Sequence, residues 1–264
     1  MKGLLAILIL GSAAFAQTPS VATGGILNAA SFDRTQPVTP GSLISIFGSN
    51  LAATTTLADS IPLSTVLGNV KVSINGTDAP LTGVFHTGNG DQINAQLPWA
   101  TQSGQAQVVV TNNGVASPAQ TFQVAQAAPG IFSVNFGTGQ AIAINPDGSL
   151  AAPAGSIPGL STRPSKVGSD AFMIILATGL GAVSPSVADG HNATDGLRTN
   201  TTTPIVTVGG KQVTVLFSGL SQDFVGVNQI NVQLPAGTPT GDAVPLQITM
   251  GGLTSTDKVT IAVQ

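Results

Sequence analysis

The chain has 264 residues, of which 42% are hydrophobic and only 7% are charged, with two histidines and no cysteine. Eleven acidic residues, all of them aspartates, face eight basic ones, and the sequence pI is near 5.0. This composition excludes disulfides, cysteine-based metal sites and a basic surface for nucleic acid or an anionic membrane. Because solvent-facing helices depend on Glu, Lys and Arg, it also argues against a helical fold.

The N-terminus has the features of a secretory signal peptide, which we place at residues 1–16. A lysine is followed by the apolar run "GLLAILIL" and then by "GSAAFAQ", whose alanines occupy the small-residue positions before a cleavage site. The apolar run is too short to span a bilayer, which needs about 20 residues. We expect a mature protein that begins near Gln17, is secreted to the periplasm or the extracellular space, and does not insert into a membrane.

Residues 17–126 have the pattern of an immunoglobulin-like β-sandwich. Alternating segments such as "SLISIFG", "NVKVSING", "QINAQLP" and "GQAQVVVTNNG" are separated by Gly, Pro and Asn. Short strands with turn residues every 8 to 12 positions are typical of all-β sandwiches. Asn75 and Gly76 lie between two such segments, where Asn-Gly predicts a type I′ hairpin turn.

Residues 127–264 repeat the same order. "MIILATGLG", "VTVGGKQVTV", "QINVQLP" and "GDAVPLQITMGG" correspond to segments of the first half, and 92–114 and 229–251 have the same length. An internal duplication explains this correspondence and predicts two tandem immunoglobulin-like sandwiches. The second domain carries an insertion at about 137–170, where "INPDGSL" predicts a tight turn within a long ordered loop or cover strand.

The repeated strand alternates apolar and amide residues. Because successive side chains of a strand point to opposite faces, the apolar set should face the core and the amides should face outward. The amides can serve packing and solvation, or they can recognise a partner protein or a sugar. The lone tryptophan beside the first copy can stack on a sugar ring or belong to a core or domain seam. The candidate ligand-binding residues are therefore Gln92, Asn94, Gln229, Asn231 and Trp99.

The loop "ADGHNATDG" is the candidate metal site. Calcium takes six to eight oxygen ligands, and Asp189, Asn192 and Asp195 offer such oxygens on one short loop. The spacing differs from that of an EF-hand, and Asp and Asn also favour turns without any ion. We expect no other cofactor.

The sequence lacks the residues of a recognisable active site. It has no G-x-S-x-G segment, and a hydrolase triad would also need a histidine oriented by a carboxylate. His86 and His191 are both expected to be surface residues. The glycine pairs in "FGTGQA" and "TGLGAV" lack the third glycine of a dinucleotide fingerprint and are expected to be turns. We therefore expect a protein that is not an enzyme and has no catalytic residues.

Several motifs in this order resemble a known family: "ILNAASF", "PGSLISIFGSNL", "QINAQLPW", "APGIF", "INPDGSL", "ATGLG" and "QINVQLPAG". From about Gly25 to Val263 the chain is similar to an uncharacterised C-terminal domain family of secreted acidobacterial (Solibacter-type) proteins, whose halves look like IPT/TIG immunoglobulin-like domains. The resemblance implies export, two tandem sandwiches and association with other extracellular modules, and it implies no catalytic residues. The family usually shows "NPARRG" after the "DGSL" turn, whereas this chain has "TRPSKVG", with Arg163 and Lys166 as its basic residues.

Two functions fit these observations. The first is a secreted, non-catalytic structural, adhesive or protein-interaction module of the bacterial cell surface, whose partners are other extracellular or envelope proteins. The second is an extracellular carbohydrate-binding module that uses the amide rows and Trp99. Neither function involves nucleic acid.

Overall fold

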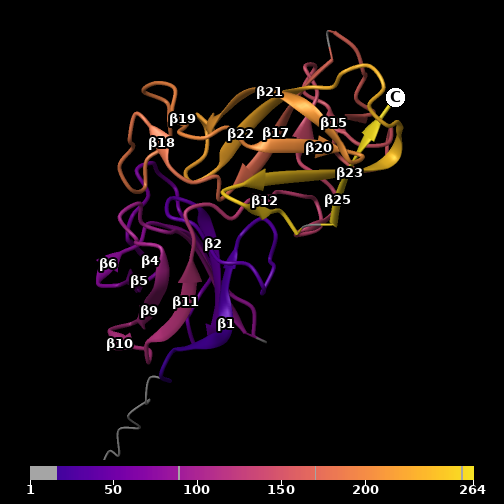
Figure 1. Ribbon diagram of the computed structural model, residues 1–264. Helices are drawn as coiled ribbons and strands as arrows, with labels where there is room; N and C mark the ends of the chain where they lie inside the picture. Colours follow the sequence, from indigo (N-terminus) through magenta and orange to yellow (C-terminus); the bar gives the residue numbers. More distant parts are fainter. Residues whose placement is uncertain (1–16, 89, 170, 257) are drawn as a thin grey trace, which may run out of the picture.

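The computed structural model describes residues 17–88, 90–169, 171–256 and 258–264, so the predicted signal peptide lies outside the described residues. These ranges contain strands, turns and loops but no helix, and thus no helix able to cross a membrane. The strands form two lobes stacked end to end along the chain (Figure 1). The predicted all-β fold of tandem immunoglobulin-like sandwiches is confirmed.

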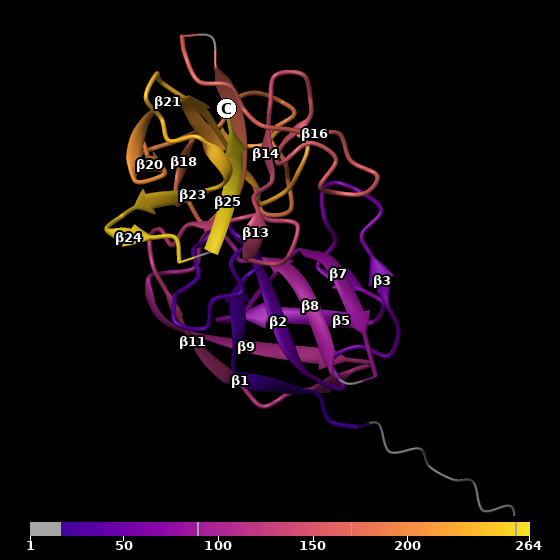
Figure 2. The same ribbon diagram turned by 90° about the vertical axis from the view of Figure 1, so that its right-hand side faces the viewer.

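The first lobe is a sandwich of two sheets. One sheet has the order β1 (Ser20–Asn28), β2 (Leu43–Ser49), β8 (Asp91–Gln96), β7 (Leu81–His86) and β3 (Thr56–Leu57). The other contains β10 (Val115–Ala116), β9 (Gly104–Asn112), β5 (Val70–Ile74) and β4 (Val66–Leu67), with β11 (Gln120–Val124) on β9 and β6 (Thr77–Asp78) on β5. Figure 2 shows β1, β2, β8 and β7 side by side below the second lobe.

The second lobe contains the remaining strands. The central ones are β17 (Phe172–Thr178), β22 (Asn228–Gln233), β21 (Lys211–Leu220), β20 (Ile205–Val208), β23 (Gly241–Met250) and β25 (Lys258–Val263). Shorter strands flank them: β12 (Gly130–Ile131), β13 (Thr138–Gln140), β14 (Ala143–Ile144), β15 (Leu150–Ala151), β16 (Thr162–Arg163), β18 (Val183–Ser184), β19 (Thr199–Asn200) and β24 (Leu253–Thr254). Four of these, β13 to β16, lie in the inserted segment. The predicted boundary between residues 126 and 127 falls in the connection from β11 to β12.

The pairing of the strands repeats between the lobes. In the first lobe β8 lies between β2 and β7, and in the second β22 lies between β17 and β21, antiparallel in every case. The antiparallel pairs β5 with β9 and β20 with β23 also correspond, as do β9 with β11 and β23 with β25. Each copy of the repeated strand is therefore the central strand of the equivalent sheet.

The lobes differ where one strand passes between sheets. In the second lobe β21 runs unbroken, and it pairs with β20 through its first residues and with β22 through the rest. In the first lobe Ala79 and Pro80 separate the corresponding strands β6 and β7. Proline lacks the N–H that the ladder needs, so Pro80 bonds to β8 only through its carbonyl, which accepts the N–H of Gln96 at 2.8 Å. The first lobe consequently has two separate sheets, whereas the second has one continuous hydrogen-bonded path.

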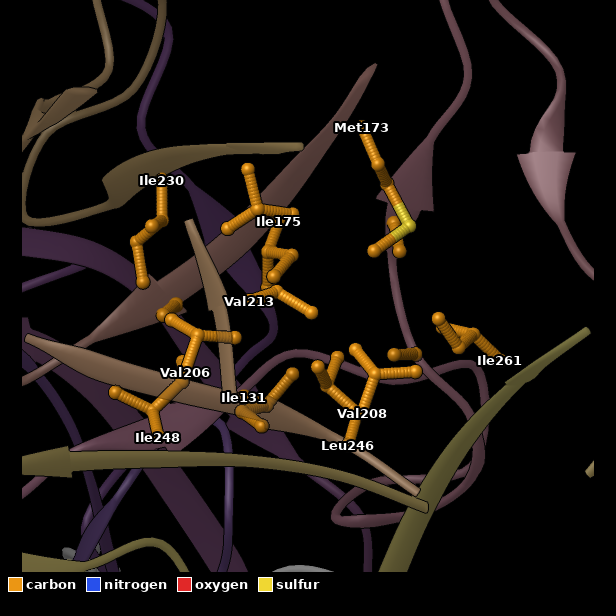
Figure 3. Packing of buried hydrophobic residues seen from close by; sticks show 14 of the residues in the cluster. Ile131, Met173, Ile175, Val206, Val208, Val213, Ile230, Leu246, Ile248 and Ile261 are labelled. Carbon is orange, nitrogen blue, oxygen red and sulfur yellow. The ribbon is translucent and has the colours of Figure 1, made fainter. Parts of the chain in front are cut away.

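Each lobe has its own hydrophobic core. The apolar side chains of β8 and β22 belong to these two clusters, and Ile93 and Ile230 are completely buried in them. Figure 3 shows Ile230 and Ile175 packed among residues of the opposing strands in the second core. The hairpin turn is confirmed as well, because Asn75 and Gly76 both have positive φ, at 49° and 86°, between paired β5 and β6.

Candidate functional site

The four candidate amides form two equivalent pairs, one on each copy of the repeated strand. Gln92 Nε2 donates to Asn94 Oδ1 at 2.7 Å, and Gln229 Nε2 donates to Asn231 Oδ1 at 2.8 Å. All four side chains are half-buried. Ser45 Oγ also donates to Asn94 Oδ1 in the first lobe. The amide rows thus bond along their own strands, and ligand binding by these residues stays a prediction.

The third amide of the first row, Gln96, does not face solvent. It is completely buried at the seam between the lobes, where its Oε1 accepts the N–H of Gly190 at 2.6 Å. Its Nε2 donates to the carbonyl of Gly41 at 3.3 Å. The counterpart in the second copy, Gln233, is half-buried and donates to the carbonyl of Ser169 within its own lobe. The second lobe therefore covers one end of the amide row of the first.

The turn that reaches Gln96 consists of Asp189 and Gly190, which we call the seam turn. Asp189 Oδ1 accepts the backbone N–H of Trp99 at 2.8 Å, and the Gly190 carbonyl accepts the N–H of Leu63 at 2.9 Å. Gly190 has a φ of +77°, and a Cβ there would lie 3.0 Å from the Leu63 carbonyl oxygen. The left-handed conformation and the close approach both require glycine. Two residues of the second lobe thus make three hydrogen bonds to the first.

Two further buried side chains bond across the seam. Thr178 Oγ1 accepts the N–H of Leu43 at 3.0 Å and donates to the carbonyl of Gly226 at 2.6 Å. Asn28 Nδ2 donates to the carbonyl of Ala128 at 3.1 Å. These donors and acceptors are uncharged, so these bonds carry no ion-pair desolvation cost.

Asp33 bonds across the edge of the seam and gives it a pH dependence. Partial burial acts to raise the pKa of Asp33, but hydrogen bonds from Thr256 of the second lobe and from Thr35 outweigh it and lower the pKa below 3.8. A carboxyl whose pKa is lowered by folding stabilises the fold above its unfolded pKa. That contribution is lost as the pH falls through the folded value.

We therefore expect Thr256→Val to lower the free energy of unfolding at neutral pH, and we expect this deficit to shrink once the pH falls below about 4. Urea denaturation over a pH series measures it. Thr254→Val is the matched control, because the Thr254 hydroxyl bonds to the hydroxyl of Thr249 and, among the described residues, to no carboxylate. A Thr256→Val deficit that stays constant from neutral to acid pH would contradict the assignment.

The candidate calcium ligands each have a protein partner. Asp189 belongs to the seam turn, and Asn192 Oδ1 accepts the hydroxyl of Thr194 at 3.0 Å. Both carboxylate oxygens of Asp195 accept from Nη2 of Arg198, at 2.9 and 2.8 Å. Among the described residues, no group of three or more His, Cys, Asp or Glu is arranged to hold a metal ion. Calcium binding at this loop stays a prediction, while the contacts that the structure shows for its three side chains are structural.

The two histidines lie in different places. His86 Nδ1 is 2.8 Å from Asp91 Oδ1, and the ring is half exposed. Asp91 is buried, and its second oxygen accepts the N–H of Leu51 at 2.7 Å, so this carboxylate holds the end of β2 against β8. His191 is exposed beside the seam turn, with Nδ1 at 3.1 Å from the Asp189 carbonyl oxygen.

Arg163 of the "TRPSKVG" segment bonds to the turn of the inserted segment. Arg163 Nε donates to Asp147 of the "DGSL" turn. This bond, together with those from the Ser149 hydroxyl and backbone N–H, holds the pKa of Asp147 far below its usual range. Arg163 therefore links the end of the inserted segment to the turn at Asp147 within the same segment.

Trp99 lies at the seam, beside a cleft of about 540 Å³ between the lobes. The benzene part of its indole packs on Gly41, where a Cβ would lie only 2.2 Å from the ring. Its Nε1 is buried and has no hydrogen-bond partner among the described residues. Of the two places that the sequence left open, core or seam, the structure shows the seam.

Comparison with known proteins gives a family for part of the chain. An IPT/TIG domain is found at residues 31–124. This match covers most of the first lobe, including the first copy of the repeated strand. A search of the curated proteins found no match.

Among solved structures, the chain is similar to SGBP-B of the Bacteroides ovatus mixed-linkage glucan utilization locus, solved with a mixed-linkage heptasaccharide, at 12% identity and a TM-score of 0.34. It is also similar to SGBP-B of a Bacteroides uniformis xyloglucan utilization locus, at 14% and 0.26, and to domains 5–6 of the S-layer protein SbsC, at 9% and 0.27. The alignments cover 86%, 90% and 94% of this chain and 43%, 48% and 99% of those chains. The chain thus spans less than half the length of the two SGBP-B proteins.

Sequence reasoning missed most of the residues that join the IPT/TIG domain to the second lobe. Asn28, Thr178 and Asp33 carry no local pattern that separates a cross-seam bond from an ordinary turn or strand residue. The sequence contained one signal that Gln96 and Gln233 have different surroundings. The two copies diverge directly after their shared proline, with Trp99 in the first and Ala236 in the second.

Proposed function

We propose that the protein is a secreted, non-catalytic structural module of the cell surface or extracellular space, in which two sandwiches act as one rigid unit. The observation that carries the proposal is the seam between the lobes, where Gly190 bonds to the buried Gln96 and to Leu63, and Asp189 accepts the backbone N–H of Trp99. A seam of this kind fixes the angle between two domains, whereas independent domains are usually joined by exposed, flexible linkers.

The surface chemistry supports the same proposal. A chain with 7% charged residues presents mainly hydroxyl, amide and glycine backbone groups to its surroundings. Such a surface is better suited to contact with other neutral extracellular surfaces than to the electrostatic steering of a charged partner. Asp91, the carboxylate beside His86, also accepts the N–H of Leu51 at the end of β2. This contact favours a structural over a catalytic role for His86.

We further propose that the second lobe is a second copy of the IPT/TIG domain and that the pair belongs to the acidobacterial family noted above. The equivalent strand pairing around β8 and β22 supports the duplication. The signal-like residues 1–16 support export.

Fractionation of the producing cells tests the structural role. We expect the mature protein outside the cytoplasm, retained with the envelope or cross-linked to an envelope protein, and released by a chaotrope. A protein that fractionates as a free cytoplasmic monomer, or as a freely diffusing monomer without any cross-linked partner, contradicts it.

A second candidate function is carbohydrate binding. The specific observation that favours it is the cleft beside Trp99, where none of the described lining residues is charged. Neutral hydroxyl and amide groups next to an aromatic ring suit a neutral, hydroxyl-rich ligand.

A further inference from the structure

The cleft between the lobes is built from both domains and from the connection between them. The first domain contributes Trp99 and the segment 101–103, and the second contributes Leu180, Met250 and the segment 201–202. Its volume of about 540 Å³ falls within the range of roughly 300 to 1,000 Å³ that is usual for small-molecule sites. A ligand in this cleft would contact both lobes at once.

The wall of the cleft is held in place before any ligand arrives. The backbone of Trp99 is fixed by Asp189, and its indole is fixed by the close contact with Gly41. The first contact crosses the seam and the second lies within the first lobe, and together they preorganise the aromatic surface. Preorganisation reduces the ordering cost that a binding site otherwise has to meet.

The chemistry of the lining is neutral and mixed. Thr101, Ser103 and Thr202 have no side-chain hydrogen bonds within the described part of the chain. The apolar part of the lining includes Leu180 and Met250, both of which are buried. The indole Nε1 of Trp99 is buried and has no hydrogen-bond partner among the residues that the structure describes. A ligand with a carboxylate, phosphate or ammonium group would find no opposite charge among these residues. A neutral sugar has apolar C–H faces for the ring and hydroxyls for the rim.

We propose that this cleft is a binding site for a neutral oligosaccharide that bridges the two lobes, with Trp99 as its aromatic platform. The proposal rests on the carbohydrate-binding candidate above and gives it one location. It excludes the outer amide pairs Gln92–Asn94 and Gln229–Asn231 as the main site.

The chain contains its own reporter for this test. Trp99 is the only tryptophan and tyrosine is absent, so intrinsic fluorescence reports on this cleft alone. The mature protein is titrated with cellohexaose, xylohexaose and mannohexaose up to about 10 mM, with oligogalacturonate as the charged control. At least one neutral sugar should shift the emission of Trp99 and protect it from acrylamide, and the charged sugar should do neither.

Variants locate the site by calorimetric titration with the same sugar. Trp99→Ala should weaken binding by at least about tenfold, and Trp99→Phe, which keeps a ring but loses the N–H, should weaken it less. Thr202→Phe narrows the cleft from an exposed position and should weaken binding by about tenfold without disturbing the seam. This second variant keeps the test valid if Trp99→Ala fails to fold.

The possible failures are distinguishable. Binding that leaves Trp99 fluorescence unchanged and is lost in Asn94→Ala or Asn231→Ala overturns the cleft while carbohydrate binding stands. No binding of any neutral sugar overturns the cleft and the carbohydrate candidate together. Neither result bears on the rigid structural unit, which the fractionation tests separately.

Discussion

Replacing Ile230 by alanine should lower the free energy of unfolding by about 3 to 5 kcal/mol. Ile230 is completely buried on the central strand β22, within the core shown in Figure 3. Truncation removes the transfer free energy of the deleted groups and leaves a cavity that a β-sandwich core closes only in part. Ile93→Ala should have a similar effect in the first core, because Ile93 has the same place on β8.

Gln229→Ala is the matched control for Ile230→Ala, since Gln229 is the preceding residue and points to the opposite, half-buried face. Its loss removes one side-chain hydrogen bond and should cost about 1 kcal/mol or less. Urea denaturation followed by far-UV circular dichroism measures both variants. Equal losses for the two would show that the strand is not divided into a core face and an outer face.

The second large effect is expected at the seam. Gln96→Ala should lower the free energy of unfolding by about 2 to 4 kcal/mol, because it leaves the Gly190 N–H and the Gly41 carbonyl buried without partners. A buried donor or acceptor without a partner loses its hydration and gains nothing in return.

The internal repeat supplies the control for Gln96. Gln233→Ala removes the equivalent amide from a half-buried position within the second lobe and should cost about 1 kcal/mol or less. The same denaturation series compares the two. If Gln233→Ala costs as much as Gln96→Ala, the buried cross-seam bonds do not distinguish the two copies, and the account of the seam is wrong.

The sequence predicted the parts of this fold that depend on local pattern. Alternation placed Ile93 and Ile230 in the cores, and the Asn75–Gly76 pair predicted its hairpin because both residues tolerate positive φ. The break between β6 and β7 also has a local cause in Pro80. Each of these features depends on one residue and its neighbours along the strand.

The seam depends on contacts between residues far apart in the chain. Gln96 and Gln233 occupy the same position of the same motif, yet only Gln96 is covered, because the second lobe packs over one end of β8. The sequence predicts Asp189 as a calcium ligand, which stays a prediction, and it does not predict that Asp189 Oδ1 accepts the N–H of Trp99. That contact depends on the position of the other lobe, which no local pattern encodes.

The most direct test of a single rigid unit is equilibrium unfolding of the mature chain, with Trp99 fluorescence and far-UV circular dichroism as two probes of the same samples. Fluorescence reports on the seam, because Trp99 is the only tryptophan, and circular dichroism reports on the strands of both lobes. Coincident curves with one midpoint are the expected result, because lobes joined through a buried seam unfold together. Two separate transitions, with Trp99 exposed at a denaturant concentration that leaves most strands intact, would contradict the account.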